Sequence, residues 1–356
     1  MARIDTFLEL LVKQDGSDLH LISGNPPRIR MHGELIGVKY RDLSAAETMA
    51  LLNEIMSDAA REAFETRSSI DFAYAIPNLA RFRVTVYRHV NGVGAVLRVI
   101  PTVIKSMEQL GLPSVLAGFC QQRKGLVLCT GPTGSGKSTT LAALVDHVNT
   151  TRKGHILTIE DPIEFVHPNK ACLMSQREVG FDTLSFSAAL HSALREDPNV
   201  ILVGEMRDLE TISLAVTAAE TGILVFGTLH TNGAAATVDR IVNVFPPGDQ
   251  GRIRSMLSTS LLGVVSQQLV KKSDGKGRVA ALEILVNNPA VSNILRDGKT
   301  EQIATAIQSG SLQGMQSMDM ALRRLMDAKV ITGKEAYRKA INKREFDMYA
   351  EPELAA

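Results

Sequence analysis

Residues 131–138, Gly-Pro-Thr-Gly-Ser-Gly-Lys-Ser, constrain the fold of this chain more than any other stretch. They have the spacing of a phosphate-binding loop, in which backbone N–H groups surround phosphate oxygens, the lysine reaches the β- and γ-phosphates and the serine binds Mg²⁺. An apolar run, residues 126–130, precedes the loop, and a helical apolar pattern, residues 141–148, follows it. This setting predicts binding of ATP with Mg²⁺ through Gly131, Pro132, Thr133, Gly134, Ser135, Gly136, Lys137, Ser138 and Thr139.

Four short apolar runs indicate a parallel β-sheet around this loop. They cover residues 126–130, 156–159, 200–203 and 223–228, and helical patterns lie between them. Continuous apolar runs of this length are typical of strands that are buried on both faces. Strands that alternate with helices predict an α/β fold with right-handed crossovers.

The first 100 residues predict a smaller α+β module. Apolar spacing predicts helices over residues 4–13 and 45–64, the second with Ser44 and Glu47 as a capping box. Alternating patterns and turn residues predict strands around residues 19–21 and 29–31, and a hairpin of residues 81–87 and 94–100. We therefore expect domains at 1–100 and 113–270, a linker at 101–112 and a polar, helical portion at 271–356.

Composition argues against some classes of function. The formal net charge is +1 and aromatic residues make up 4% of the chain, so neither a basic field nor a stacking surface for nucleic acid is expected. No run of eighteen apolar residues occurs, which predicts no direct membrane insertion. The start of the chain does not resemble a signal peptide, and three scattered cysteines suit reduced thiols, so a cytoplasmic location is expected.

Acidic residues and a histidine follow three of the apolar runs. Glu160, Asp161 and Glu164 follow the run at 156–159, Glu205 follows 200–203, and His230 follows 223–228. Open parallel sheets bind ligands at these strand ends. Glu205 and Ser138 suit Mg²⁺, and a further carboxylate is needed to activate water. Spacing leaves open whether Glu164 or Glu160 is that base, and Glu160 is also a candidate for Mg²⁺. The alternative for the whole acidic cluster is a solvated turn at the end of a strand. His230 could sense the γ-phosphate.

Arginines could neutralise the charge of the reacting γ-phosphoryl group. A hairpin centred between residues 90 and 91 would place Arg83 opposite Arg98, and two opposed cations favour an anion between them. Arg195 is a further candidate, although it could instead pair with Glu196 or Asp197. For Arg83 and Arg98 the alternative is a role as solvated arginines of an edge strand.

In order, the motifs GPTGSGKST (131–139), ILTIEDPIEF (156–165), ILVGEMRDLET (201–211) and GTLHTNGAAATVDRI (227–241) resemble those of secretion and pilus ATPases, above all the type IV pilus retraction ATPases. The resemblance covers about residues 3–345. It implies a RecA-like P-loop ATPase core with a PAS-like N-terminal domain. It also implies catalytic roles for Lys137, Glu164, Glu205, His230 and Arg195, and nucleotide contacts for Arg83 and Arg98.

The resemblance further implies a homo-hexamer that acts on the inner-membrane pilus platform protein from the cytoplasmic face. The four-cysteine zinc element of the assembly and secretion relatives is missing, which favours retraction over assembly. A helix motif linked to retraction, AIRNLIRE, reads AVSNILRD here, with Ser292 and Asp297 as the departures. An accessory retraction paralogue, an assembly ATPase, a RecA-like nucleic-acid motor and a non-catalytic regulator remain as alternatives.

Overall fold

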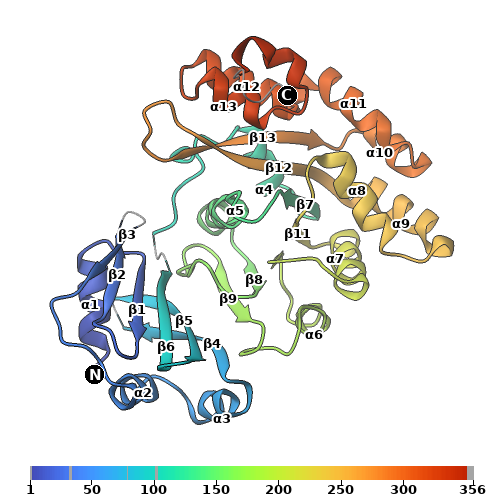
Figure 1. The fold of residues 1–356 in the computed structure, drawn as a ribbon. Helices are drawn as coiled ribbons and strands as arrows, with labels where there is room; N and C mark the ends of the chain where they lie inside the picture. Colours follow the sequence, from blue (N-terminus) through green and yellow to red (C-terminus); the bar gives the residue numbers. More distant parts are fainter. Residues whose placement is uncertain (1, 32–33, 78, 101–102, 351–356) are drawn as a thin grey trace. The chain divides into compact units, whose positions relative to one another are not determined.

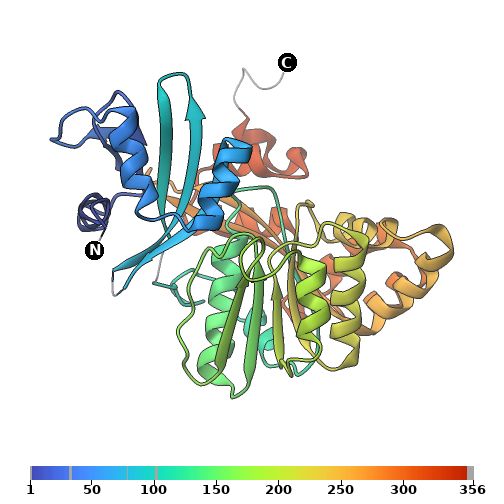
Figure 2. The same ribbon diagram turned by 90° about the horizontal axis from the view of Figure 1, so that it is seen from below.

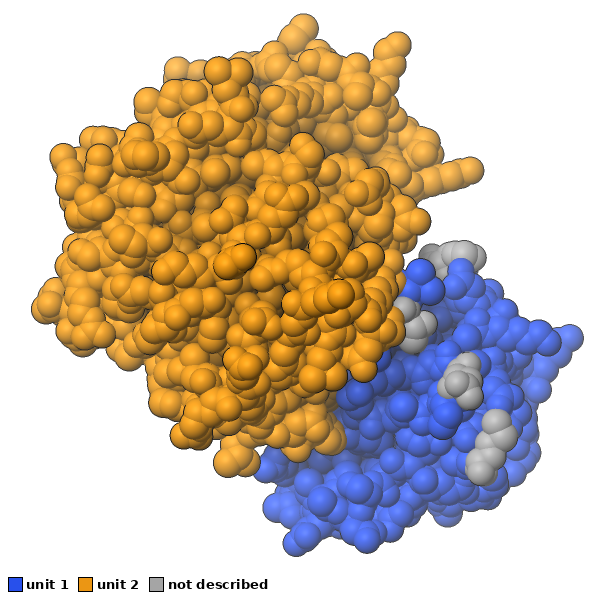
Figure 3. Space-filling model, turned by 180° about the vertical axis from the view of Figure 1, so that it is seen from behind, with its two compact units in different colours: residues 1–103, 164–166 blue, residues 104–163, 167–356 orange. Residues whose placement is uncertain are grey.

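The computed structural model describes residues 2–31, 34–77, 79–100 and 103–350. It divides into two compact units, residues 1–103 with 164–166 (unit 1) and residues 104–163 with 167–356 (unit 2) (Figure 3). Each unit has its own sheet and its own hydrophobic core.

Unit 1 is built on a six-stranded antiparallel sheet with the strand order β3-β2-β1-β6-β5-β4 (Figure 1). Val84 and Val86 alternate along β5 and share a core with Leu8 and Phe64 from the helices. The predicted α+β module and its hairpin are confirmed. The elements are α1 (Asp5–Lys13), β1 (Asp18–Ile22), β2 (Arg28–Met31), β3 (Glu34–Gly37), α2 (Ala45–Asn53), α3 (Asp58–Arg67), β4 (Ser69–Ile76), β5 (Ala80–His89) and β6 (Gly92–Ile100).

The single helix predicted over residues 45–64 is wrong, because the structure has two helices, α2 and α3, in this stretch. Ser57 has an extended backbone, and its hydroxyl accepts a hydrogen bond from the N–H of Ala60 at 3.2 Å. Ser57 is therefore a second N-cap, which ends the first helix and starts the next. The capping box of Ser44 and Glu47 is confirmed.

Unit 2 contains a seven-stranded sheet with the order β13-β12-β7-β11-β10-β8-β9 (Figures 1 and 2). All neighbouring pairs are parallel except β12 and β13. The four apolar runs form buried central strands, so the predicted α/β fold is confirmed. The strands are β7 (Gly125–Thr130), β8 (His155–Glu160), β9 (Leu173–Glu178), β10 (Val200–Val203), β11 (Leu224–Leu229), β12 (Leu261–Lys271) and β13 (Arg278–Val286).

Helices cover both faces of this sheet. Leu126 and Leu128 of β7 share a core with α6 (Phe186–Ala193), α7 (Leu209–Thr221), α8 (Ala234–Asn243) and α9 (Pro247–Ser260). Val127 and Cys129 share another core with α4 (Val115–Cys120) and α5 (Lys137–Thr151). The last elements are α10 (Pro289–Asp297), η1 (Thr300–Gln302), α11 (Ile303–Ser309), η2 (Ser311–Gln313), α12 (Met318–Asp327), α13 (Gly333–Lys339) and η3 (Lys343–Tyr349).

The start of the helical portion, predicted at residue 271, is wrong. β12 ends there and forms a hairpin with β13, so the helices begin only at Pro289. The hairpin has a weak sequence signal because polar residues, Ser266–Gln268 and Glu283, interrupt its apolar runs. β9 was also not predicted, because this edge strand carries mainly polar side chains.

The predicted linker, residues 101–112, is only partly a linker. Residues 101–102 lie outside the described residues, and the chain joins unit 2 from residue 104. Met107 is buried in the core beneath α4 and α5, which ties this stretch to unit 2. Within the described ranges, no helix is both long enough and apolar enough to cross a membrane.

Candidate active site

Three parallel neighbours, β7, β11 and β10, bring the main sequence motifs to one edge of the sheet. The phosphate-binding loop follows β7, His230 follows β11 and Glu205 follows β10. The loops after parallel strands leave the sheet at the same edge, where open α/β folds bind their ligands. β8, the next strand, ends at Glu160, where the acidic cluster begins.

Three glycines allow the phosphate-binding loop to adopt backbone angles that other residues rarely adopt. Gly131, Gly134 and Gly136 have φ angles of 139°, 76° and 87°, which L-residues with a side chain rarely adopt. A Cβ atom on Gly131 would also overlap the carbonyl oxygen of Gln267. The hydroxyl of Ser135 is buried and has no hydrogen-bond partner within the described part of the chain, so it suits a phosphate oxygen.

Lys137 folds back onto the loop. Its Nζ donates hydrogen bonds to the carbonyl oxygens of Gly131 at 2.8 Å and Pro132 at 3.1 Å, and the residue is buried. Ser138 and Thr139 follow in the first turn of α5 and are half-buried. These two hydrogen bonds hold the ammonium group beside the loop backbone.

Gln267 of β12 contacts the phosphate-binding loop, and the sequence analysis did not predict this role. Its Nε2 donates to the carbonyl oxygen of Ser135, and its Oε1 accepts from the hydroxyl of Thr140, both at 2.7 Å. The side chain is buried and joins the loop to the first turn of α5. The signal available in the sequence was a polar trio, Ser266–Gln268, inside an otherwise apolar run.

Glu205 and His230 are in contact. Nε2 of His230 lies 3.1 Å from Oε1 of Glu205, and Arg207 binds the same carboxylate, with its NH2 group 2.6 Å from Oε2. Burial raises the pKa of Glu205, but Arg207 and His230 together hold it below its ordinary value. The Glu205 carboxylate is therefore ionised at neutral pH, and Arg207 is a further site residue that the sequence reading did not single out.

The two candidates for the base differ in their surroundings. Oε1 of Glu160 accepts hydrogen bonds from the hydroxyl of Thr158 at 2.7 Å and from Nε2 of Gln176 at 3.3 Å. Glu164 is exposed and belongs with residues 165–166 to unit 1. Glu160 is thus engaged by its own strand, β8, and by the neighbouring β9, whereas Glu164 is exposed to solvent.

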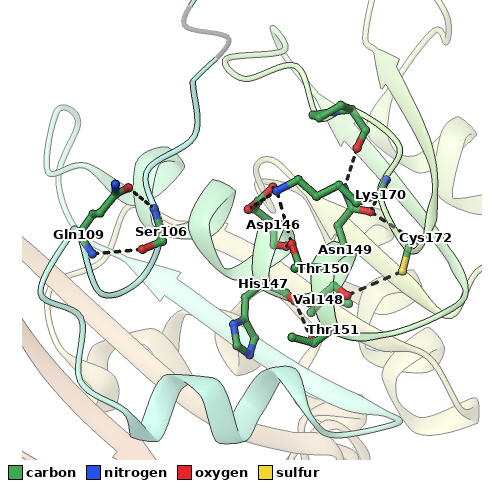
Figure 4. Close-up of polar contacts among 11 residues, drawn as sticks. Ser106, Gln109, Asp146, His147, Val148, Asn149, Thr150, Thr151, Lys170 and Cys172 are labelled. Atoms are coloured by element: carbon green, nitrogen blue, oxygen red, sulfur yellow. Dashed lines mark hydrogen bonds and ion pairs between the residues drawn. The ribbon is translucent and has the colours of Figure 1, made fainter.

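Asn149, which is fully buried in α5, holds the stretch that follows the acidic cluster (Figure 4). Its Oδ1 accepts from the N–H groups of Lys170 at 3.2 Å and Cys172 at 3.3 Å, and its Nδ2 donates to the carbonyl oxygen of Pro168 at 2.7 Å. Nζ of Lys170 also lies 2.7 Å from Asp146 on the same helix. The first turn of α5 therefore belongs to the phosphate-binding loop, and its last turns hold residues 168–172, which follow the acidic cluster.

Arg83 and Arg98 lie directly opposite each other on β5 and β6, so the predicted register is confirmed. Each has a carboxylate of the protein itself nearby. Nε of Arg98 donates to Asp18 at 2.7 Å, and Nε of Arg83 lies 3.8 Å from Asp71. The two opposed charges are therefore partly balanced within the protein and are weak support for a bound anion, and the nucleotide contact of Arg83 and Arg98 stays a prediction.

Arg195 is exposed just after α6 in unit 2. Glu196, the rival partner expected from the sequence, instead binds NH1 of Arg177 at 3.1 Å. The structure therefore gives no support to an ion pair between Arg195 and Glu196.

The AIRNLIRE-like segment forms the helix α10. The hydroxyl of Ser292 donates to the carbonyl oxygen of Ser258 in α9 at 2.8 Å, so this side chain is turned toward the neighbouring helix. Asp297 pairs with Lys299 at 3.0 Å. Both departures are thus accommodated within unit 2.

Known proteins resemble this chain in sequence and in fold. A family model described as "Type II/IV secretion system protein" matches residues 2–346. The type IV pilus retraction ATPase PilT of Pseudomonas aeruginosa is 53% identical over 95% of this chain and 98% of its own. The type IV pilus ATPase PilU of that organism is 40% identical over 93% and 87%. A crystal structure of the pilus retraction motor PilT with bound ADP is 42% identical, with a TM-score of 0.91 over 98% of this chain and 99% of that chain. The chain therefore belongs to the type II/IV secretion system protein family.

Proposed function

We propose that this protein is an ATP-hydrolysing motor that drives type IV pilus retraction, and hence twitching motility. One observation carries the enzymatic part: the phosphate-binding loop, Glu205 and His230 follow three neighbouring parallel strands and meet at one sheet edge. The close similarity to the retraction ATPase PilT over nearly the whole chain supports the retraction part.

Lys137, Ser135 and Ser138 bind the phosphates of ATP in this proposal, and Ser138 and Glu205 hold Mg²⁺. The fit rests on the hydroxyl of Ser135, which has no hydrogen-bond partner among the described residues, and on the ionised carboxylate of Glu205, since Mg²⁺ prefers oxygen ligands. When bound, the metal neutralises charge that develops on the β- and γ-phosphates. Arg207 and His230 orient Glu205 until the nucleotide arrives.

Glu164 accepts a proton from the water that attacks the γ-phosphorus. The bond between the γ-phosphorus and the β–γ bridging oxygen breaks, which gives ADP and phosphate. Its exposed carboxylate is open to water, whereas Glu160 already accepts two side-chain hydrogen bonds. Glu160 remains the weaker candidate, with an additional Mg²⁺ role. His230 senses the γ-phosphate from the end of β11.

The remaining features rest on the family resemblance. Arg83, Arg98 and Arg195 contact the nucleotide phosphates, and six copies form a ring at the cytoplasmic face of the inner membrane. Hydrolysis is coupled to movement of the inner-membrane platform protein. An accessory retraction paralogue and an assembly or type II secretion ATPase are the alternatives, and the greater identity to PilT than to PilU favours the main retraction motor.

Deletion of the gene tests the retraction role. We expect cells that carry surface pili but do not retract them, with retraction restored by the wild-type gene and not by Lys137→Ala at matched expression. Cells without pili would indicate an assembly ATPase, and cells that still retract would indicate an accessory paralogue.

A further inference from the structure

Two helices of unit 2 begin at one buried carboxylate, that of Glu283 on β13. The N–H of Ala234, the first residue of α8, donates to its Oε1 at 2.8 Å. The N–H of Met318, the first residue of α12, lies close enough to the same carboxylate to lower its pKa. α8 begins just after residues 230–233, which we call the His230 loop, and α12 belongs to the C-terminal helices.

Charge explains why a carboxylate is needed there. The N-terminus of a helix carries roughly half a positive charge, so two converging N-termini repel each other without an anion between them. Burial raises the pKa of Glu283, and the N–H groups of Ala234 and Met318 oppose that shift. Asp319 of α12 adds to the upward shift. Glu283 thus stabilises both helix starts at once.

On the side of α8, this contact fixes the loop that carries His230. Ser266 lies opposite Glu283 on β12, and its hydroxyl accepts from the N–H of Gly233 at 2.9 Å. The hydroxyl of Thr237 donates to the carbonyl oxygen of Gly233 at 2.7 Å. Consecutive backbone groups after His230 are therefore held by Glu283 and Ser266.

On the other side, α12 is joined to β13 and to the end of the chain. Gln316 and Ile284 exchange backbone hydrogen bonds at 2.8 and 3.1 Å. Asp319 accepts from the N–H groups of Ile341 and Asn342 at 2.8 and 2.9 Å. A displacement of α12 is therefore transmitted to β13 beside Glu283, because Ile284 is the next residue of that strand.

We propose that Glu283 is a positioning residue that couples the C-terminal helices to His230, and through it to Glu205. The inference rests on the proposed ATPase function. Glu283 acts on the start of α8, so α12 sets the position of the His230 loop and thereby the rate of hydrolysis.

The test compares kcat and KM for ATP in the purified full-length protein. A glutamine at 283 keeps the shape but has only one acceptor oxygen, so Glu283→Gln should lower kcat about tenfold, with KM changed less than about twofold. Because Glu283 acts through His230, the double variant Glu283→Gln/His230→Ala should lose no more activity than His230→Ala alone.

The control is Ser185→Ala, which removes the hydroxyl that accepts from the N–H of Ala188 at 3.0 Å and caps α6, a helix that takes no part in the proposed coupling. Losses that add in the double variant, or an equal fall in kcat in Ser185→Ala, would overturn the inference. If Glu283→Gln does not fold, Ser266→Ala, which frees only the Gly233 side, replaces it in the same cycle. A wild-type protein that releases no phosphate would instead overturn the proposed function.

Discussion

Nε2 of His230 lies 3.1 Å from a carboxylate oxygen of Glu205, which joins the ends of the neighbouring strands β11 and β10. Because this contact links the histidine to the proposed Mg²⁺ site, His230→Ala should lower phosphate release about 100-fold while nucleotide binding remains. His191→Ala is a matched control, since Nε2 of His191 lies 3.2 Å from Glu210 and both side chains are exposed. Equal activity of both variants would show that His230 is only a satisfied polar residue.

Gln267 provides a second prediction. Gln267→Leu leaves the buried carbonyl oxygen of Ser135 and the hydroxyl of Thr140 without this partner, which should cost about 2–4 kcal/mol of unfolding free energy. The loosened loop should also raise KM for ATP. Gln268→Leu, one residue on and more exposed, should change both quantities little. Denaturant unfolding and steady-state kinetics check this, and similar behaviour of the two variants would contradict it.

Asp18 should stabilise unit 1 through Arg98. The Asp18 carboxyl is buried, which raises its pKa, but hydrogen bonds from Ser17 and Arg98 lower it below its ordinary value. The stabilisation is therefore present above the ordinary pKa and is lost as pH falls through the lower, folded-state pKa. We expect Asp18→Asn to lower the unfolding free energy by about 2 kcal/mol at pH 7, and Asp71→Asn, at an exposed pair, by less than about 1 kcal/mol. Equal losses would contradict the prediction.

His167 should make the protein less stable in mild acid. Burial lowers the pKa of His167 to about 4, whereas an unfolded histidine titrates near 6.5. Below pH 6.5 the unfolded chain binds a proton that the folded chain does not, so stability falls by about 1.5 kcal/mol between pH 6.5 and 5. Burial of His20 acts in the same direction, so the informative quantity is the difference between wild type and His167→Phe. An unchanged slope in His167→Phe would contradict the prediction.

The central strands and the phosphate-binding loop were predictable because their signals are local. Each buried strand is one uninterrupted apolar run, and the register of Arg83 and Arg98 follows from the turn between them. By contrast, the hydrogen bond between Gln267 and Ser135 joins residues 132 positions apart, and Asp18 reaches Arg98 across 80. Such pairs depend on which strands become neighbours, and no local pattern carries that information.

The β12–β13 hairpin and the break between α2 and α3 were not predicted, because each depends on polar residues whose partners the sequence does not reveal. Glu283 is unfavourable in an apolar strand taken alone, and only the two helix starts that meet it explain its place. The break between α2 and α3 likewise depends on the single hydroxyl of Ser57.

Phosphate release by the purified protein tests the central claim most directly. With ATP and Mg²⁺, and without nucleic acid, the wild type should release phosphate, and Lys137→Ala and Glu164→Gln should release it at least about 100-fold more slowly. Glu164→Gln should still bind ATP, because the phosphate-binding loop is intact. Equal release by all three proteins would contradict the account.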